Sequence, residues 1–368
     1  MRGAPARASL ATMSLHPALA RAHGFCERYR LTRPILLAPM AGASPPALSV
    51  AVAQAGGLGA CGALLMTPPA ILAWAEAVRG AGPFQLNLWI PDPAPARDPA
   101  REAELRAFLA RFGPAVPPEA GDGGPPDFAA QTRALLDAAP PIVSSVMGLY
   151  PPAFVAELKA RGIAWWANVS TVAEALAAEA AGADAVVAQG AEAGGHRGCF
   201  DAESAESGMV GTLALVPAIV DAVRIPVVAT GGIAEARGAA AALLLGASAV
   251  QVGTGFLRCP EAGIAPAWAE ALGRARPEDT RVSRAFSGRA GRSLATAYVE
   301  AATAPGAPPP APYPVQRGLT QAMREDAVRA GDVGRMQAWA GQAAGFARAA
   351  PAGEVVGDLW EGMRALLR

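Results

Sequence analysis

The sequence predicts an α/β fold, a (β/α)8 TIM barrel with an additional smaller helical region. Short apolar runs of β-prone residues recur along the chain. These runs are continuous, which is typical of parallel strands buried on both faces. Helical patterns separate most of them, and eight runs are the number that closes such a barrel. A doubly wound open sheet is the second possibility, but the GxGxxG turn usual for that fold is absent.

The elements follow one another in a regular order from residue 33 onward. The expected strands cover residues 35–40, 58–62, 84–90, 142–148, 164–170, 185–190, 226–231 and 249–253. The expected helices between them cover residues 46–55, 68–79, 152–161, 171–181, 212–224 and 234–245. Several of these helices begin at Ser, Thr or Pro and end at Gly, which is the usual capping pattern.

Three segments lie outside this repeat. Residues 1–30 contain several Arg but lack the apolar core of a secretory signal, so we expect a disordered or surface-lying extension. The barrel is expected over residues 31–275, with a Pro-rich helical insertion at about 91–140. Residues 276–368 are expected to form a helical segment that covers the barrel mouth.

The composition excludes several classes of protein. The chain has 31 basic and 31 acidic residues and no basic run, so we expect no nucleic-acid partner. Lys159 is the only lysine, and it lies in an exposed helical pattern, which argues against imine-forming enzymes. Four isolated Cys predict free thiols in a cytoplasmic protein and no structural metal site. The sequence contains no run of the roughly 18 apolar residues that a membrane span needs, so we expect no membrane span.

Two glycine-rich loops are candidates for phosphate binding. In a TIM barrel the active site lies at the C-terminal ends of the strands, and phosphate commonly binds after strands seven and eight. Those loops here read TGGIAEARG (230–238) and QVGTGFLRC (251–259). Their glycines leave backbone N–H groups open, and the first loop leads into a helix N-terminus, which favours an anion. Tight turns are the structural alternative, and we favour phosphate binding.

The loop after strand six contains the one histidine of the predicted barrel, His196, within QGAEAGGHRGCF (189–200). Its position at the active end of a strand favours a general acid or base over a structural role. Arg197 beside it would attract an anion or be a solvated loop charge.

Other strand ends carry side chains that could contact a ring. Asn87 and Gln189 end their strands with amides that suit the edge of a heterocyclic ring, and Met40 offers a soft apolar contact.

Taken in order, the motifs PILLAPMAGAS, FQLNLWIP, AQGAEAGGHRGCF, PVVATGGI and AVQVGTGFL resemble the nitronate monooxygenase family, formerly called 2-nitropropane dioxygenases. The resemblance runs from about Arg33 to Pro260. It implies an FMN-binding barrel that oxidises alkyl nitronates, and as a further expectation nitroalkanes, with O2 to a carbonyl compound and nitrite. In this family the His of the GGHRG motif is the proposed base, which falls on His196.

The resemblance also implies which residues hold FMN. Those expected at the flavin ring and ribityl chain are Met40, Asn87, Gln189 and Gly194. Those expected at the phosphate are Gly231, Gly232, Gln251, Val252, Gly253 and Thr254.

Several alternatives stay open. An FMN-dependent NAD(P)H reductase of enoyl thioesters or quinones would use the same fold, and a flavin-binding protein without catalysis is a different class. The motifs VSSVMG and WWANVST depart from the family pattern where a substrate would lie, so the substrate is not determined. We expect a monomer or a homodimer.

Overall fold

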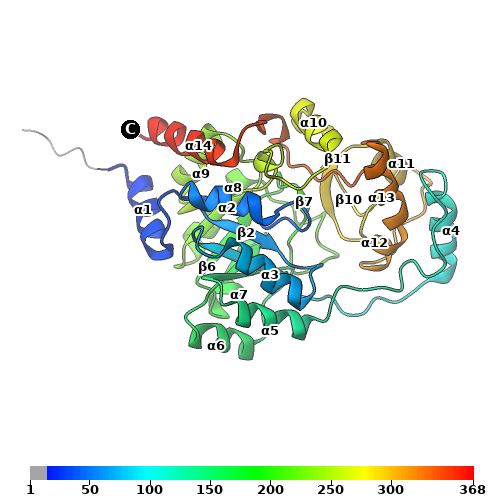
Figure 1. The fold of residues 1–368 in the computed structure, drawn as a ribbon, viewed down its shortest axis with the longest axis horizontal. Coiled ribbons are helices and arrows are strands. Elements are labelled where there is room, and N and C mark those ends of the chain that lie inside the picture. The colour runs from blue at the N-terminus through cyan, green and yellow to red at the C-terminus, as the bar shows by residue number, and fades with distance from the viewer. Residues whose placement is uncertain (1–14) are drawn as a thin grey trace, which may run out of the picture.

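Eight parallel strands form a nearly closed barrel in the computed structural model, which describes residues 15–368 (Figure 1). The strands are β1 (Ile35–Leu37), β2 (Gly59–Gly62), β3 (Phe84–Trp89), β4 (Ile142–Val146), β5 (Ala164–Val169), β6 (Ala185–Gln189), β8 (Val227–Thr230) and β9 (Ala249–Val252). They are paired in the order β1-β9-β8-β6-β5-β4-β3-β2, and a bridge between Leu36 and Leu58 joins β1 to β2. The predicted TIM barrel is therefore confirmed.

The continuous apolar runs arise because both faces of each strand are buried. Ile35 and Leu37 of β1 pack in the core between barrel and helices, whereas Leu36 packs in a second cluster with Trp166 and Val187. This alternation follows the two-residue period of a strand, and neither set is in contact with water.

Eight helices surround the barrel: α2 (Pro46–Gln54), α3 (Pro68–Val78), α5 (Phe128–Ala138), α6 (Pro152–Ala160), α7 (Val172–Ala180), α8 (Thr212–Ala222), α9 (Ala236–Leu244) and α14 (Ala352–Leu366). Two of them lie where the sequence suggested other roles. Helix α5, within the expected insertion, packs on α3 as the regular helix between β3 and β4. Helix α14, in the segment expected to cover the mouth, packs on α9, α2 and β1. It fills the eighth position because β9 is followed directly by elements of the mouth.

Helix α1 (Pro17–Tyr29) differs from the expected disordered or surface-lying extension. Its Phe25 and Tyr29 lie 5.6 and 4.8 Å from Trp166, measured between ring centroids. The helix itself lies at the N-terminal end of the barrel (Figure 1). The His16 side chain caps the helix by accepting a hydrogen bond from the Ala18 amide. A short N-terminal stretch folds here because it covers apolar strand ends that water would otherwise reach. Residues 1–14 lie outside the described residues.

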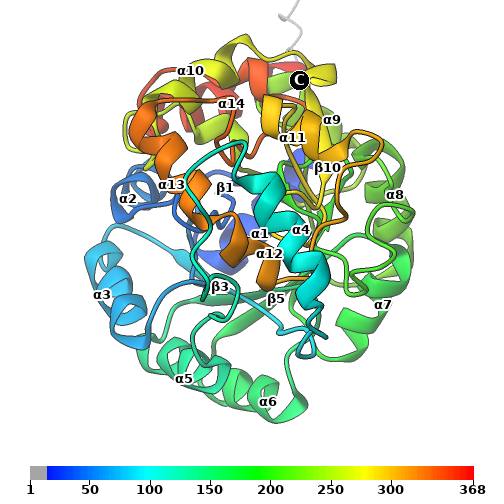
Figure 2. The same cartoon turned by 90° about the vertical axis from the view of Figure 1, so that its right-hand side faces the viewer.

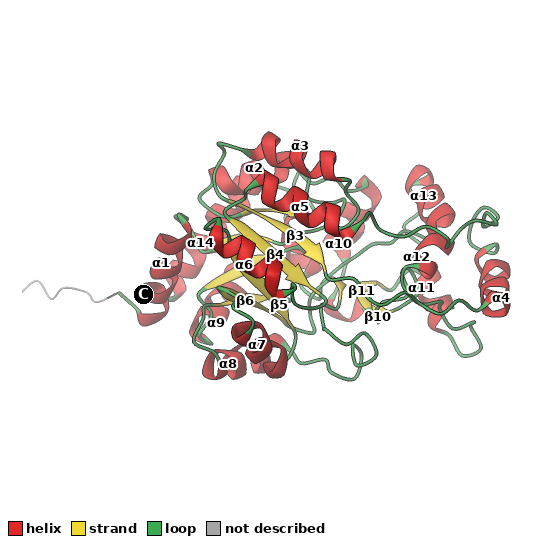
Figure 3. Ribbon diagram, turned by 90° about the horizontal axis from the view of Figure 1, so that it is seen from below, coloured by secondary structure: helices red, strands yellow, loops and turns green. Residues whose placement is uncertain are grey.

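The other end of the barrel is covered by elements from both expected extra regions, together with one helix and one short strand from within residues 31–275 (Figures 2 and 3). They are α4 (Pro99–Leu109), α10 (Pro266–Arg274), α11 (Ala297–Thr303), α12 (Val315–Leu319), α13 (Gln321–Ala330), and a small sheet of β10 (Thr280–Ser283), β11 (Gly291–Leu294) and β7 (Gly195–His196). Leu105, Phe108, Tyr298 and Val315 share one apolar cluster, so α4 is joined to the C-terminal elements. None of the helices within residues 15–368 has the length and apolar character to cross a membrane.

Candidate active site

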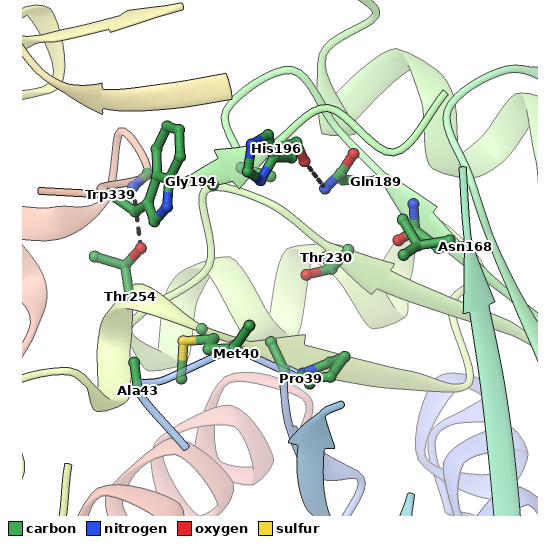
Figure 4. Close-up of a pocket in the computed structure, with 18 of the residues that line it drawn as sticks. Pro39, Met40, Ala43, Asn168, Gln189, Gly194, His196, Thr230, Thr254 and Trp339 are labelled. Carbon is green, nitrogen blue, oxygen red and sulfur yellow. Dashed lines mark hydrogen bonds between the residues drawn. The ribbon is translucent and has the colours of Figure 1, made fainter. Parts of the chain in front are cut away.

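A cavity of about 250 Å³ lies between the barrel and the elements that cover its mouth (Figure 4). All eight barrel strands contribute to its wall, either with their last residues or with the loops that follow them. The mouth contributes four large side chains: Trp268, Tyr313, Arg317 and Trp339. The cavity therefore lies where the C-terminal ends of the strands meet, as the sequence predicted.

Most of the predicted site residues line this one cavity. They are His196, Met40, Asn87, Gln189, Gly194, Gly231, Gly232, Gln251, Gly253 and Thr254. Val252 does not line it, because its side chain is buried in the core between the barrel and the helices. Only the backbone of Val252 is left for a ligand, and its carbonyl already accepts a hydrogen bond from the Ala38 amide.

His196 is held on three sides. Its strand pairs with β11, where it lies opposite Gly291, and its Nε2 lies 2.7 Å from Ser287 Oγ. The Trp89 and Trp339 rings flank the imidazole at centroid distances of 4.7 Å each. Burial, and then the positive charges of Arg289 and Arg317, lower the pKa of His196 to about 3. The imidazole is therefore neutral near pH 7.

Gln189 fastens the loop that carries His196. Its Oε1 accepts a hydrogen bond from the Gly198 amide at 2.7 Å, and its Nε2 donates to the His196 carbonyl at 3.1 Å (Figure 4). Arg197 donates from Nη1 to the Gln189 carbonyl at 2.7 Å and is buried outside the large cavity. Most of the hydrogen-bonding capacity of the Gln189 amide is therefore used within the protein. Arg197 is neither a solvated charge nor a cation that faces this cavity.

A glycine cradle, made of Gly231, Gly232, Gly253 and Thr254, lines the cavity at the ends of β8 and β9. Gly231 and Gly232 have φ angles of 110° and 72°, which only glycine adopts without strain. The amides of Gly232, Gly253 and Thr254 donate to no acceptor within residues 15–368. The cradle therefore offers unused N–H donors to an anion.

The N-terminus of α9 is not part of this anion site, contrary to the sequence-based expectation. Glu235 caps the helix, and its carboxylate accepts hydrogen bonds from the amides of Arg237 at 3.2 Å and Gly238 at 3.0 Å. A side chain of the protein thus already occupies the position that an anion would take.

Side-chain amides from β3, β5 and β9 line the cavity. Asn87 donates to Ser144 Oγ at 3.0 Å, and Gln251 Oε1 accepts a hydrogen bond from Gln85 at 3.0 Å. The Nδ2 atom of Asn168 is buried and has no hydrogen-bond partner among the described residues. An unpaired buried donor is costly, so this wall is suited to a ligand with hydrogen-bond acceptors on its edge.

A family model described as nitronate monooxygenase matches residues 26–362 of this chain. The chain belongs to the nitronate monooxygenase family. A nitronate monooxygenase from Pseudomonas aeruginosa is 42% identical over 349 residues, which are 92% of this chain and 99% of that protein. The solved structure of a nitroalkane oxidase from Streptomyces ansochromogenes matches with a TM-score of 0.83 and 38% identity over 91% of this chain and 98% of that one. FabK from Thermotoga maritima matches with a TM-score of 0.71 and 28% identity over 94% and 96% of the two chains.

Membership of the nitronate monooxygenase family confirms the resemblance found in the sequence, and it makes this chain an oxidoreductase. The match extends beyond the motifs, because it includes the last residues of α1 and most of α14. The eighth helix of the barrel therefore lies within the matched range.

Several residues that line the cavity were not predicted from the sequence. Asn168 is the penultimate residue of β5, much as Asn87 lies near the end of β3, so the same signal was present in the sequence. Tyr313, Arg317 and Trp339 carried no such signal, since they follow the last barrel strand by more than 60 residues. Arg317 lines the cavity and makes no ion pair with any described residue, which leaves its charge available to an anionic ligand.

Proposed function

We propose that this enzyme binds FMN and oxidises alkyl nitronates, and nitroalkanes after removal of a proton, with O2 to a carbonyl compound and nitrite. The observation that carries the proposal is a neutral His196 in the same cavity as the glycine cradle and Arg317, a cation that has no ion-pair partner within residues 15–368. The names of the relatives, nitronate monooxygenase and nitroalkane oxidase, support the same chemistry.

The residues present fit a flavin mononucleotide. The free amides of Gly232, Gly253 and Thr254 suit its phosphate, with Gly231 and Gln251 beside them. This phosphate site needs no lysine, because backbone N–H groups supply the donors.

The ring and ribityl chain of FMN would meet a second set of groups. Met40 offers an apolar surface, while Asn87 and Asn168 offer amides to the polar edge of the ring. Gly194 permits the close approach of the backbone of residues 340 and 341, which bounds this part of the cavity. Gln189 has one Nε2 hydrogen left after binding the His196 loop. When bound, FMN would supply the electron acceptor and the reaction with oxygen.

The protein's own groups would handle the substrate. His196 would take the proton from the α-carbon of a neutral nitroalkane, leaving the electron pair on the substrate as a nitronate. A preformed nitronate has already lost this proton and needs no base. Arg317 would attract the anion, and the rings of Trp89 and Trp339 would fix the imidazole and exclude water from it.

The test is a turnover assay on purified protein. We expect bound FMN, identified after release from the protein, and nitrite formation with oxygen uptake on ethyl nitronate or propionate 3-nitronate without NADH or NADPH. Rapid anaerobic reduction of the flavin by either nicotinamide would instead indicate the reductase alternative. Bound flavin with no nitrite and no oxygen uptake would indicate a protein without this catalysis.

A further inference from the structure

Ser287 lies directly behind His196, in the turn that precedes β11. The serine is 1% exposed, and its Oγ is 2.7 Å from His196 Nε2. The same hydroxyl lies 3.2 Å from the Arg289 carbonyl and 3.3 Å from the Arg289 amide nitrogen, which donates to it. Ser287 is therefore a member of a closed hydrogen-bond network on the side of the imidazole that faces away from the large cavity.

The number of hydrogens in this network decides how His196 is protonated. A hydroxyl has one hydrogen to donate, and a carbonyl oxygen can only accept. Among the described residues, Ser287 is the one donor to the Arg289 carbonyl. If Ser287 donated to His196 instead, this carbonyl would lose its partner in a site that is almost completely buried, which is unfavourable. The favoured arrangement has Ser287 donating to Arg289 and His196 Nε2–H donating to Ser287.

The other ring nitrogen is left free by this arrangement. His196 Nδ1 accepts no hydrogen bond from any residue within 15–368, and it is not among the buried unpartnered atoms of the structure. In the Nε2–H form its lone pair is available to a substrate.

We propose that Ser287 is a positioning residue that holds His196 in the Nε2–H form, so that Nδ1 is the atom that receives the substrate proton. The inference rests on the proposed role of His196 as base. In the step, the substrate Cα–H bond breaks, its electron pair remains on the nitronate, and a new N–H bond forms at Nδ1. The imidazolium still donates from Nε2 to Ser287, so no group in the network has to rotate.

The turn that carries Ser287 is anchored on the His196 loop. Arg289 is 2% exposed, and its guanidinium donates to both carboxylate oxygens of Asp92 at 2.9 Å and to the Cys199 carbonyl at 3.1 Å. Cys199 is three residues from His196, so Arg289 joins the serine turn to the histidine loop. The 2.7 Å contact is thereby held from both sides.

The first test reads the proton position directly. The chain has three histidines, so labelling with ¹⁵N-histidine gives three imidazoles, and His196→Asn identifies the signals of His196. In the flavin-loaded wild type at pH 7 we expect Nε2 to carry the hydrogen and Nδ1 to carry none. In Ser287→Ala we expect a mixture of both forms. A wild-type His196 with its hydrogen on Nδ1, or an unchanged Nε2–H form in Ser287→Ala, would overturn the proposal.

The second test uses the two substrate classes. Ser287→Ala should lower kcat on a neutral nitroalkane tenfold or more and leave kcat on preformed nitronate within twofold. Ser293→Ala removes another fully buried serine, on β11, that donates to the Leu294 carbonyl and does not touch His196. This control should spare both activities. An equal loss on both substrates in Ser287→Ala would show a general structural role.

The two tests separate the proposal from the function on which it rests. The NMR result does not depend on turnover, so a protein without nitronate activity would still report its imidazole form. If neither substrate is oxidised by the wild type while His196 carries Nε2–H, the proposed function fails and the hydrogen-bond network stands.

Discussion

At the residue scale, His196 shows how a weakly basic group can serve as a base. Burial and the nearby charges of Arg289 and Arg317 disfavour the imidazolium, so the ring is neutral across the neutral pH range and only weakly basic. An anionic product in the same cavity would favour the protonated ring, because opposite charges attract strongly in a site with little water. Proton transfer and formation of the nitronate anion therefore support each other.

The substitution His196→Asn separates the two proposed substrates. Asparagine retains polarity but cannot act as the base, so kcat on neutral nitroalkane should fall about 10²–10⁴-fold. Oxidation of preformed nitronate should remain within about threefold of the wild type. Nitrite release on matched pairs, such as nitroethane and ethyl nitronate, measures both, and equal losses would assign His196 to binding.

The lowered pKa of His196 predicts that the stability of the folded protein depends on pH. An unfolded imidazole takes up its proton near pH 6.5, whereas the folded one does so near pH 3. Between these values the unfolded state binds more protons, so the free energy of unfolding falls as the pH falls, by up to about 1.4 kcal/mol per pH unit. Urea unfolding between pH 7.5 and 4.5 should show a smaller decline in His196→Asn than in the wild type. Parallel declines would contradict the lowered pKa.

At the element scale, loops and an added helix shape the two ends of the barrel. The segment with Trp339 and Gly341 crosses the Gly194 loop so closely that a Cβ on Gly194 would lie 2.4 Å from the Gly341 nitrogen. At the opposite end, α1 places Phe25 and Tyr29 against Trp166. The first contact shapes the cavity, and the second stabilises the barrel far from it.

Gly194→Ala should therefore weaken flavin binding. The added methyl would contact backbone atoms of residues 340 and 341, which cannot move without displacing the Trp339 segment. We expect the Kd for FMN, measured by quenching of flavin fluorescence, to rise at least tenfold. Gly124→Ala is the matched control, because a Cβ there meets nothing within 4 Å. Unchanged affinity in Gly194→Ala would show that the close approach does not shape the flavin site.

Phe25→Ala should destabilise the protein and leave its chemistry intact. Loss of a buried phenylalanine costs about 3–5 kcal/mol, since a cavity remains beside Trp166. Thermal unfolding should show the loss, while kcat on nitronate at 25 °C stays within twofold. Leu213→Ala, at a side chain that is 72% exposed on α8, should change neither quantity. Unchanged thermal stability in Phe25→Ala would show that the packing of α1 against Trp166 does not stabilise the barrel.

At the scale of the whole molecule, the barrel and the elements that cover its mouth each supply part of the site. The strand ends and βα loops supply the glycine cradle, the amides and His196, while the cover supplies Ser287, Arg317 and Trp339. Helix α4 packs against the C-terminal elements through Phe108 and Tyr298, so two distant chain segments form one cover (Figure 2). The wall of the cavity is complete only when both parts are in place.

The sequence by itself determined the barrel, the order of its strands, and the loops that carry His196 and the glycines. These features are local: continuous apolar runs reflect strands buried on both faces, and glycines at strand ends reflect turns that need positive φ. Only the tertiary structure decided that α5 and α14 belong to the barrel, that α1 covers its end, and that Ser287, Tyr313, Arg317 and Trp339 reach the site. The reason is that closure of a barrel and its cover depends on contacts between residues far apart in the chain, and no local pattern encodes these contacts.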